Sequence, residues 1–155
     1  MNMTVQDLYN KLLIEHYKRT EQRYEPSKYT HSGTGHNHAC GDEITLFFTI
    51  EGSKIISASY TGKGCMICQA SASMLTNAIE GLKLDEARQT IRHLNELLDG
   101  ATEPARNDPD YAALTSIRDF PTRMKCAKLA WDTAEKILGS WHGQLSGEIA
   151  NSARS

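Results

Sequence analysis

The stretch EITLFFTIEGSKIISASYTGKGCMIC, residues 43–68, decides the fold. Apolar residues alternate with threonines over residues 43–51, which is typical of a strand with one face in a core. Gly52 and Ser53 predict a hairpin turn, and residues 54–61 predict a second strand that returns beside the first. Gly62 and Gly64 end that strand, and a helix is expected over residues 66–79. The small side chains at residues 70–73 indicate that this helix lies close to a sheet.

Helices are expected on both sides of this hairpin. Thr4 is a candidate N-cap for a first helix that runs to about Arg19, and Gly100 ends another over about residues 85–98. Asp108 and a proline at position 109 predict a short helix through residue 118, and a last helix is expected over residues 121–139. Residues 20–37 are mostly loop, with a short edge strand near residues 29–35. These elements predict an α+β fold, a small antiparallel β-sheet of about three strands with helices packed on it.

The composition restricts both the partners and the location. The chain has 155 residues and a formal net charge of −2, so we expect one domain over residues 1–139 and a polar, flexible tail over residues 140–155, where Trp141 could dock. The absence of a general basic surface argues against nucleic acid as a partner, and the apolar runs are too short to cross a membrane. With no secretory signal at the N-terminus, we expect a cytoplasmic protein whose cysteines are ligands or reactive thiols rather than disulfides.

Three cysteines stand in settings that suit metal binding. Cys40 is followed by Gly41 and Asp42, Cys65 follows Gly64 at a helix start, and Cys126 lies near the start of the last helix. If the fold brings Cys40, Cys65, Cys126 and Asp42 together, three thiolates and a carboxylate form a four-ligand site for zinc or an iron–sulfur cluster.

Two further features of the sequence bear on the state of these thiols. The positive end of a helix is expected to lower the pKa of Cys65, and neighbouring cations that of Cys126. The positively charged residues expected to compensate the charge of the site are Lys63, Arg123 and Lys125.

Other cysteine and histidine residues leave alternatives open. Cys65 and Cys68 form a Cys-x-x-Cys pair that is compatible with redox chemistry, but the pair follows an antiparallel hairpin, so a buried neighbour or spare ligand is the preferred interpretation of Cys68. His31, His36 and His38 precede Cys40 and are either accessory ligands or proton acceptors, or, as we prefer, ordinary exposed loop residues. His16 lies on the inward stripe of the first helix, and no motif accompanies His93.

The motifs together resemble the U-type iron–sulfur cluster assembly proteins, and most closely the SufU branch of the SufU, IscU and NifU N-terminal group. The resemblance is carried by residues 39–42, residues 62–65 with 70–74, residues 123–131, and the opening segment from residue 8 to residue 17. Two features indicate the SufU branch. About 60 residues separate Cys65 from Cys126, which fits the inserted segment of SufU-type proteins, and Lys125 stands where IscU-type proteins have a histidine. The chaperone-docking motif of IscU is absent. The chain departs from the family at His38, where proline is frequent, and at Cys68, where serine is common.

The resemblance implies a SufE/IscU-like fold and a zinc site formed by Cys40, Asp42, Cys65 and Cys126. It further implies that a SufS-type, pyridoxal-phosphate-dependent cysteine desulfurase delivers persulfide sulfur to Cys40. Other SUF assembly proteins are further partners that the resemblance implies. The chain would then be sulfurtransferase-like. The alternatives are a non-catalytic scaffold that builds a [2Fe–2S] cluster on the same ligands, a zinc-stabilised interaction domain without sulfur chemistry, and a thiol oxidoreductase.

Overall fold

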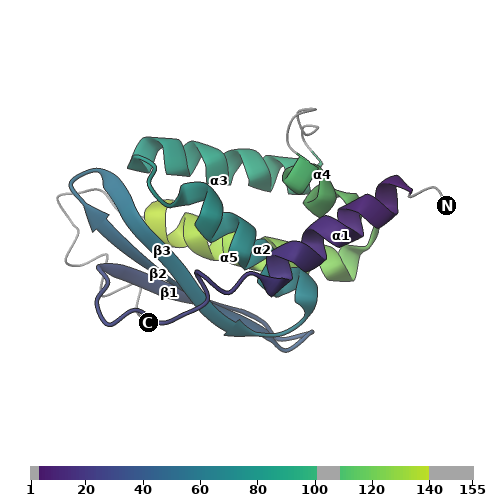
Figure 1. Cartoon of the computed structure of the whole chain (residues 1–155), viewed down its shortest axis with the longest axis horizontal. Helices are drawn as coiled ribbons and strands as arrows, with labels where there is room; N and C mark the ends of the chain where they lie inside the picture. The colour runs from purple at the N-terminus through teal and green to yellow at the C-terminus, as the bar shows by residue number, and fades with distance from the viewer. Residues whose placement is uncertain (1–3, 101–108, 140–155) are drawn as a thin grey trace.

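The computed structural model describes residues 4–100 and 109–139. The elements, in chain order, are α1 (Val5–Lys18), β1 (His31–Asn37), β2 (Asp42–Glu51), β3 (Lys54–Lys63), α2 (Met66–Ile79), α3 (Leu84–Leu98), α4 (Pro109–Thr115), a 3₁₀ turn (Ser116–Asp119) and α5 (Pro121–Gly139). They form one three-stranded antiparallel sheet with helices packed against it, so the predicted α+β class is confirmed (Figure 1).

The central hairpin follows the alternation of the sequence. Strands β2 and β3 pair from Glu43 with Lys63 to Glu51 with Lys54, and Gly52 turns the chain with φ +62. The residues of β2 that point into the core are buried, namely Ile44, Leu46, Phe48 and Ile50. Phe47 points the other way but is also buried, with the Tyr29 ring 5.0 Å from its own in an edge-to-face contact.

The predicted edge strand β1 is present, but it begins and ends two residues later than the expected residues 29–35. Its seven residues pair with β2 along their whole length, from His31 opposite Phe48 to Asn37 opposite Asp42. Its polar, glycine-containing sequence is typical of a loop, but Gly35 allows a close approach between layers. A Cβ atom at Gly35 would lie 2.1 Å from the Oγ1 of Thr133 in α5. Pairing with β2 and packing against α5, rather than strand propensity, therefore stabilise this strand.

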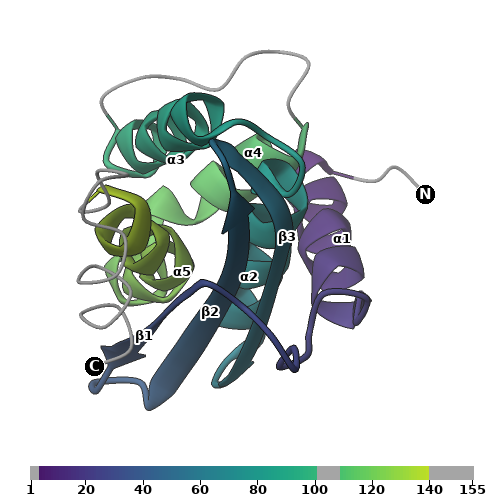
Figure 2. The same cartoon turned by 90° about the vertical axis from the view of Figure 1, so that its left-hand side faces the viewer.

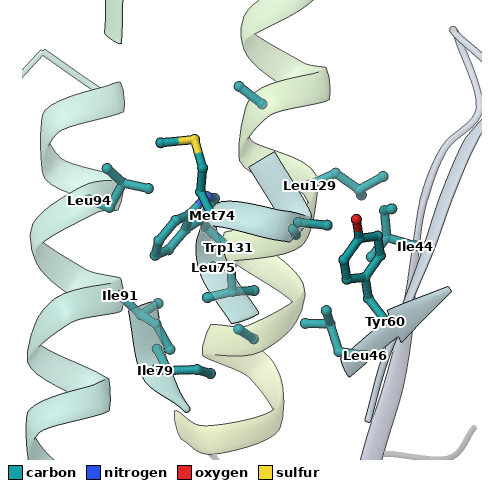
Figure 3. Packing of buried hydrophobic residues seen from close by; sticks show 14 of the residues in the cluster. Ile44, Leu46, Tyr60, Met74, Leu75, Ile79, Ile91, Leu94, Leu129 and Trp131 are labelled. Carbon is teal, nitrogen blue, oxygen red and sulfur yellow. The ribbon is translucent and has the colours of Figure 1, made fainter. Parts of the chain in front are cut away.

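Helix α2 lies at the centre of the helical layer, with α1 on one side and α5 on the other (Figure 2). The indole Nε1 of Trp131 in α5 donates a hydrogen bond to the Ser71 Oγ at 2.8 Å, and that hydroxyl donates to the Ala127 carbonyl oxygen at 2.6 Å. Trp131 and Met74 lie toward α3, where Ile91 and Leu94 meet them, while Leu129 faces Ile44 of the sheet (Figure 3). This apolar packing holds α2 and α5 rigidly against the sheet, and both helices carry cysteines of the site.

Most expected boundaries are confirmed within one or two residues. The capping box of α1 is formed by Thr4 and Asp7, and α2 spans the expected residues. Strand β3 continues two residues beyond the expected end, to Lys63, and the short helix after position 109 finishes as a 3₁₀ turn. The predicted N-cap Asp108 and the tail over residues 140–155 lie outside the described residues. None of the described helices is long and apolar enough to cross a membrane.

Candidate metal centre

Three segments far apart in the chain meet at one end of the sheet. The turn between β1 and β2 carries Cys40, the first residue of β2 is Asp42, and the second turn of α5 carries Cys126. One donor atom from each of these three residues lies within 4.8 Å of the other two. The predicted convergence is therefore present for one carboxylate and two sulfur atoms.

Cys65 joins this group through Asp42. The backbone N–H of Cys65 donates to Asp42 Oδ1 at 3.0 Å, and the Cys65 Sγ lies 4.0 Å from Asp42 Oδ2. The sheet register explains the proximity, because Glu43 pairs with Lys63 and the next residues along each strand are Asp42 and Gly64. Asp42 is 2 % exposed, so its carboxylate is fixed at the bottom of the site.

Gly64 is necessary for this contact. It adopts φ +137, a conformation that side chains rarely allow, and a Cβ atom there would lie 2.2 Å from Asp42 Oδ1. Gly41 also has a positive φ of +71, but no atom lies within 4 Å of the position of its Cβ. A side chain at position 64 would therefore collide with Asp42. At position 41 there is space for a side chain, and glycine is favoured there only because of the positive φ.

The helix termini position the other two sulfur atoms. Cys65 is the N-cap of α2, and its Sγ accepts from the backbone N–H of Cys68 at 3.5 Å. The Sγ of Cys126 lies 3.7 Å from the Thr122 carbonyl oxygen one turn earlier and 3.9 Å from the Asn37 Nδ2. Sequence reasoning missed Asn37 as a neighbour of the site; its place three residues before Cys40 was the only available signal.

The electrostatics differ from the expectation for Cys126. Burial raises the pKa of this thiol well above its ordinary value, and hydrogen bonds to Asp42 and Cys65 raise it further. The prediction that Arg123 and Lys125 would lower it is wrong, because both side chains are exposed while Cys126 is 3 % exposed and faces a carboxylate. Without a cation this position favours the neutral thiol, and a bound divalent cation would favour the thiolate.

The candidate compensating cations lie at the surface. Lys63 is exposed at the end of β3, and the Arg123 guanidinium lies 6.0 Å from the centroid of the Phe120 ring. Within the described part of the chain, no ion pair joins Lys63, Arg123 or Lys125 to Asp42. Their role in compensating the charge of a bound group remains a prediction.

Cys68 is fully buried beside the site. Burial raises its pKa strongly, and the negative charges of Asp42, Cys65 and Cys40 add to the effect. A thiol in this state is a poor nucleophile, so the structure disfavours a redox role for the Cys-x-x-Cys pair. It agrees with the preferred interpretation of Cys68 as a buried neighbour of the site.

The histidines divide into two groups. His31 is 4 % exposed in β1, at the opposite end of the strand from Asn37, so the expectation of an exposed loop residue is wrong for it. His36 and His38 are exposed, as expected. His16 is buried in α1, and His93 is exposed on α3.

The fold and the cluster of thiols around a buried carboxylate define a small α+β domain equipped to hold a thiophilic metal. The family model of the NifU-like N terminal domain matches residues 8–146, and the chain belongs to that family.

Individual relatives are consistent with the resemblance seen in the sequence. The chain is 32% identical over 143 residues to the zinc-dependent sulfurtransferase SufU of Bacillus subtilis, covering 92% of this chain and 97% of that protein. It is 29% identical to the iron–sulfur cluster assembly scaffold protein IscU of Thermotoga maritima, with 88% and 96% covered. The crystal structure of the SufU protein FiSufU from Fervidobacterium islandicum AW-1 superimposes with a TM-score of 0.74 at 26% identity, covering 83% of this chain and 94% of that chain. The predicted SufU/IscU-like class is confirmed.

Proposed function

We propose that this protein binds zinc through Cys40, Asp42, Cys65 and Cys126 and accepts persulfide sulfur on Cys40 during iron–sulfur cluster assembly. The observation that carries the proposal is an asymmetry of exposure. Cys40 and Cys65 are exposed, whereas the Asp42 carboxylate and the Cys126 thiol, which lie within 4.8 Å of the Cys40 donor atom, are buried. Thiolate and carboxylate donors of this kind fit zinc, and the group fits no alkaline-earth cation, which prefers oxygen ligands alone.

The position of Cys40 on a turn supports this residue, rather than the exposed Cys65, as the sulfur acceptor. When bound, zinc would supply a charge that keeps thiols deprotonated at neutral pH. Asp42 begins β2, Cys126 lies in α5, and Cys65 caps α2 with its N–H bonded to Asp42, whereas Cys40 sits on a turn of residues 38–41. Cys40 is therefore the donor that can leave the centre at the smallest structural cost and meet a partner.

Sulfur transfer from the donor needs no oxidant or reductant. The Cys40 thiolate attacks the outer sulfur of a persulfide on a SufS-type, pyridoxal-phosphate-dependent cysteine desulfurase. A new S–S bond forms at Cys40 while the S–S bond of the donor breaks, and the desulfurase cysteine leaves as a thiolate. In this role the protein works in the cytosol, beside other proteins of the SUF system.

The proposal is tested by following labelled sulfur. Zinc-loaded protein is incubated with a cysteine desulfurase and sulfur-labelled cysteine, and peptide mass spectrometry locates the persulfide. We expect label on Cys40 and its loss in the Cys40→Ser variant, with the desulfurase itself still active. The matched control Cys68→Ser should retain the label on Cys40. Transfer that persists in Cys40→Ser would contradict the proposed role.

A second candidate is a scaffold that assembles a [2Fe–2S] cluster on the same residues. It is favoured by the donor set, since thiolate-rich sites also suit iron–sulfur clusters, and by the similarity to a relative named as a scaffold. Metal and sulfide analysis of protein isolated without oxygen separates the two. A brown protein with iron and sulfide supports the scaffold, and a colourless one with about one zinc per chain supports the sulfur acceptor.

Two other functions are less well supported. A thiol oxidoreductase would need Cys68 as a partner of Cys65, but Cys68 is buried and has a raised pKa. A zinc-stabilised interaction domain would need no reactive thiol, yet Cys40 is exposed at the site. Unchanged thiol alkylation and sulfur acceptance in the Cys68→Ser variant would exclude the thiol oxidoreductase. A Cys40 that accepts no sulfur in the native protein would support the zinc-stabilised interaction domain.

A further inference from the structure

Two histidines and one glutamate lie close to Cys40 and Asp42 in the sequence and are not used by the cysteine centre. His36 is in β1, and His38 is the first residue of the turn that follows this strand. Their rings are stacked, with centroids 5.3 Å apart and planes 4° from parallel. Glu43, the partner of His36 in the register of β1 and β2, has its Oε1 3.4 Å from the His36 Nδ1.

These three residues have the donor chemistry of a borderline metal ion. Imidazole nitrogen binds zinc, nickel, copper and iron, and a carboxylate oxygen completes many such sites. We propose that His36, His38 and Glu43 form a second binding site, separate from the cysteine centre, for a divalent cation of the zinc class.

The donor atoms of these three residues do not all lie within 4.8 Å of one another, so the proposed site forms only when an ion binds. The side chains of His36 and Glu43 are 47% and 39% exposed, and His38 is exposed in the turn. Rotation of the exposed His38 side chain would bring its imidazole to an ion placed between the His36 imidazole and the Glu43 carboxylate. A simple ion pair between His36 and Glu43 would need no contribution from His38, so the role of His38 distinguishes a metal site from an ion pair.

The second site should be weaker than the cysteine centre. It offers neutral imidazoles and one carboxylate in water, whereas the cysteine centre offers thiolates around the buried Asp42. Three flexible, exposed side chains also lose conformational freedom when an ion orders them.

The location of the second site suggests how it acts. His38 lies two residues before Cys40, and Glu43 follows Asp42 directly. Both sites therefore share the turn that carries the exposed cysteine. An ion held by the histidines would be retained next to Cys40, so the second site would speed the loading of the cysteine centre; this part of the inference rests on the proposed zinc binding there.

The test uses full-length protein that already carries one equivalent of zinc. A second equivalent of Zn²⁺ is titrated in, its dissociation constant is measured by calorimetry, and the imidazole nitrogens are followed by NMR. We expect a second, weaker binding event that shifts the ring signals of both His36 and His38. Loss of a supporting partner alone lowers metal affinity by about 10–100-fold, so the double variant His36→Ala/His38→Ala should weaken the second event at least as much.

Three variants sharpen the outcome. His38→Ala alone should weaken the second event, which an ion pair between His36 and Glu43 would not predict, and Glu43→Gln should weaken it less. His93→Ala, an exposed histidine on α3, is the matched control and should change nothing. The proposal is overturned if no second equivalent binds, or if it binds the double variant as it binds the native protein. Failure of sulfur transfer to Cys40 would not affect this result, because the readout is zinc at the imidazoles.

Discussion

The two ends of the cysteine centre contrast sharply. Cys126 is 3 % exposed, sits on a helix packed into the core, and has a raised pKa, whereas Cys40 is exposed on a four-residue turn. Both sulfur atoms nevertheless lie within 4.8 Å of the same carboxylate oxygen. A metal centre can therefore be held firmly from its buried side while its exposed side presents a thiol to a partner.

The two glycines of the site show the same contrast in the backbone. Both have positive φ values, but only Gly64 lies against Asp42. The buried side of the centre depends on a close contact, and the exposed side depends on a turn conformation that has free space around it.

The largest expected effect comes from breaking the buried side. In Gly64→Ala the new methyl group would meet Asp42 Oδ1, separating the carboxylate from the Cys65 N–H, so zinc affinity should fall by about 10–100-fold or more. The matched variant Gly41→Ala adds only the strain of a positive φ, about 1–2 kcal/mol, and should bind zinc more tightly than Gly64→Ala. Competition with a chelator measures both, and equal losses would mean that the two sides do not differ.

Thiol reactivity tests the contrast directly. In metal-free native protein, Cys40 should be alkylated more than about tenfold faster than Cys126 and Cys68, because the latter two are buried and have raised pKa values. A time course of iodoacetamide labelling, read by peptide mass spectrometry, gives the order. Early modification of Cys126 would show that the buried side opens in solution.

A smaller effect is expected where the core supports the buried side. Ser71→Ala removes the acceptor of the Trp131 indole N–H and the donor to the Ala127 carbonyl, so the free energy of unfolding should fall by about 1–3 kcal/mol. Urea denaturation measures the change. The control Ser53→Ala, at the exposed hairpin turn, should stay within about 0.5 kcal/mol of the native protein.

The smallest effect concerns His31, away from the centre. Burial lowers its pKa, so below the ordinary value of 6.5 the unfolded chain takes up a proton that the folded protein does not. The free energy of unfolding should therefore fall as the pH decreases below this value, by at most about 1.4 kcal/mol per pH unit for one group. Denaturation of metal-free protein between about pH 7.5 and pH 5.5 measures the slope, which should be smaller in His31→Gln. An unchanged slope in that variant would assign the dependence to other groups.

Sequence reasoning predicted the hairpin and helices well, because alternation, caps and glycines are local signals. It placed β1 two residues too early, because the bounds of this polar strand depend on its pairing with β2 and on the close approach of α5 at Gly35. It also placed His31 in solvent and assigned Cys126 a lowered pKa from its basic neighbours. Both errors have the same origin, since burial depends on segments that are distant in the chain.

The sequence by itself determined the elements and the donor types, since hydrogen bonding, glycine conformation and sulfur chemistry belong to single residues and their near neighbours. Only the tertiary structure decided that Asp42 is buried beside the Cys65 N–H and that Asn37 approaches Cys126. It also decided that Cys40 and Cys65 are exposed while Asp42 and Cys126 are buried. Those facts follow from the register of β2 with β3 and from the packing of α5 against β1. Position in space, and the desolvation that comes with it, is a property of the whole packed chain.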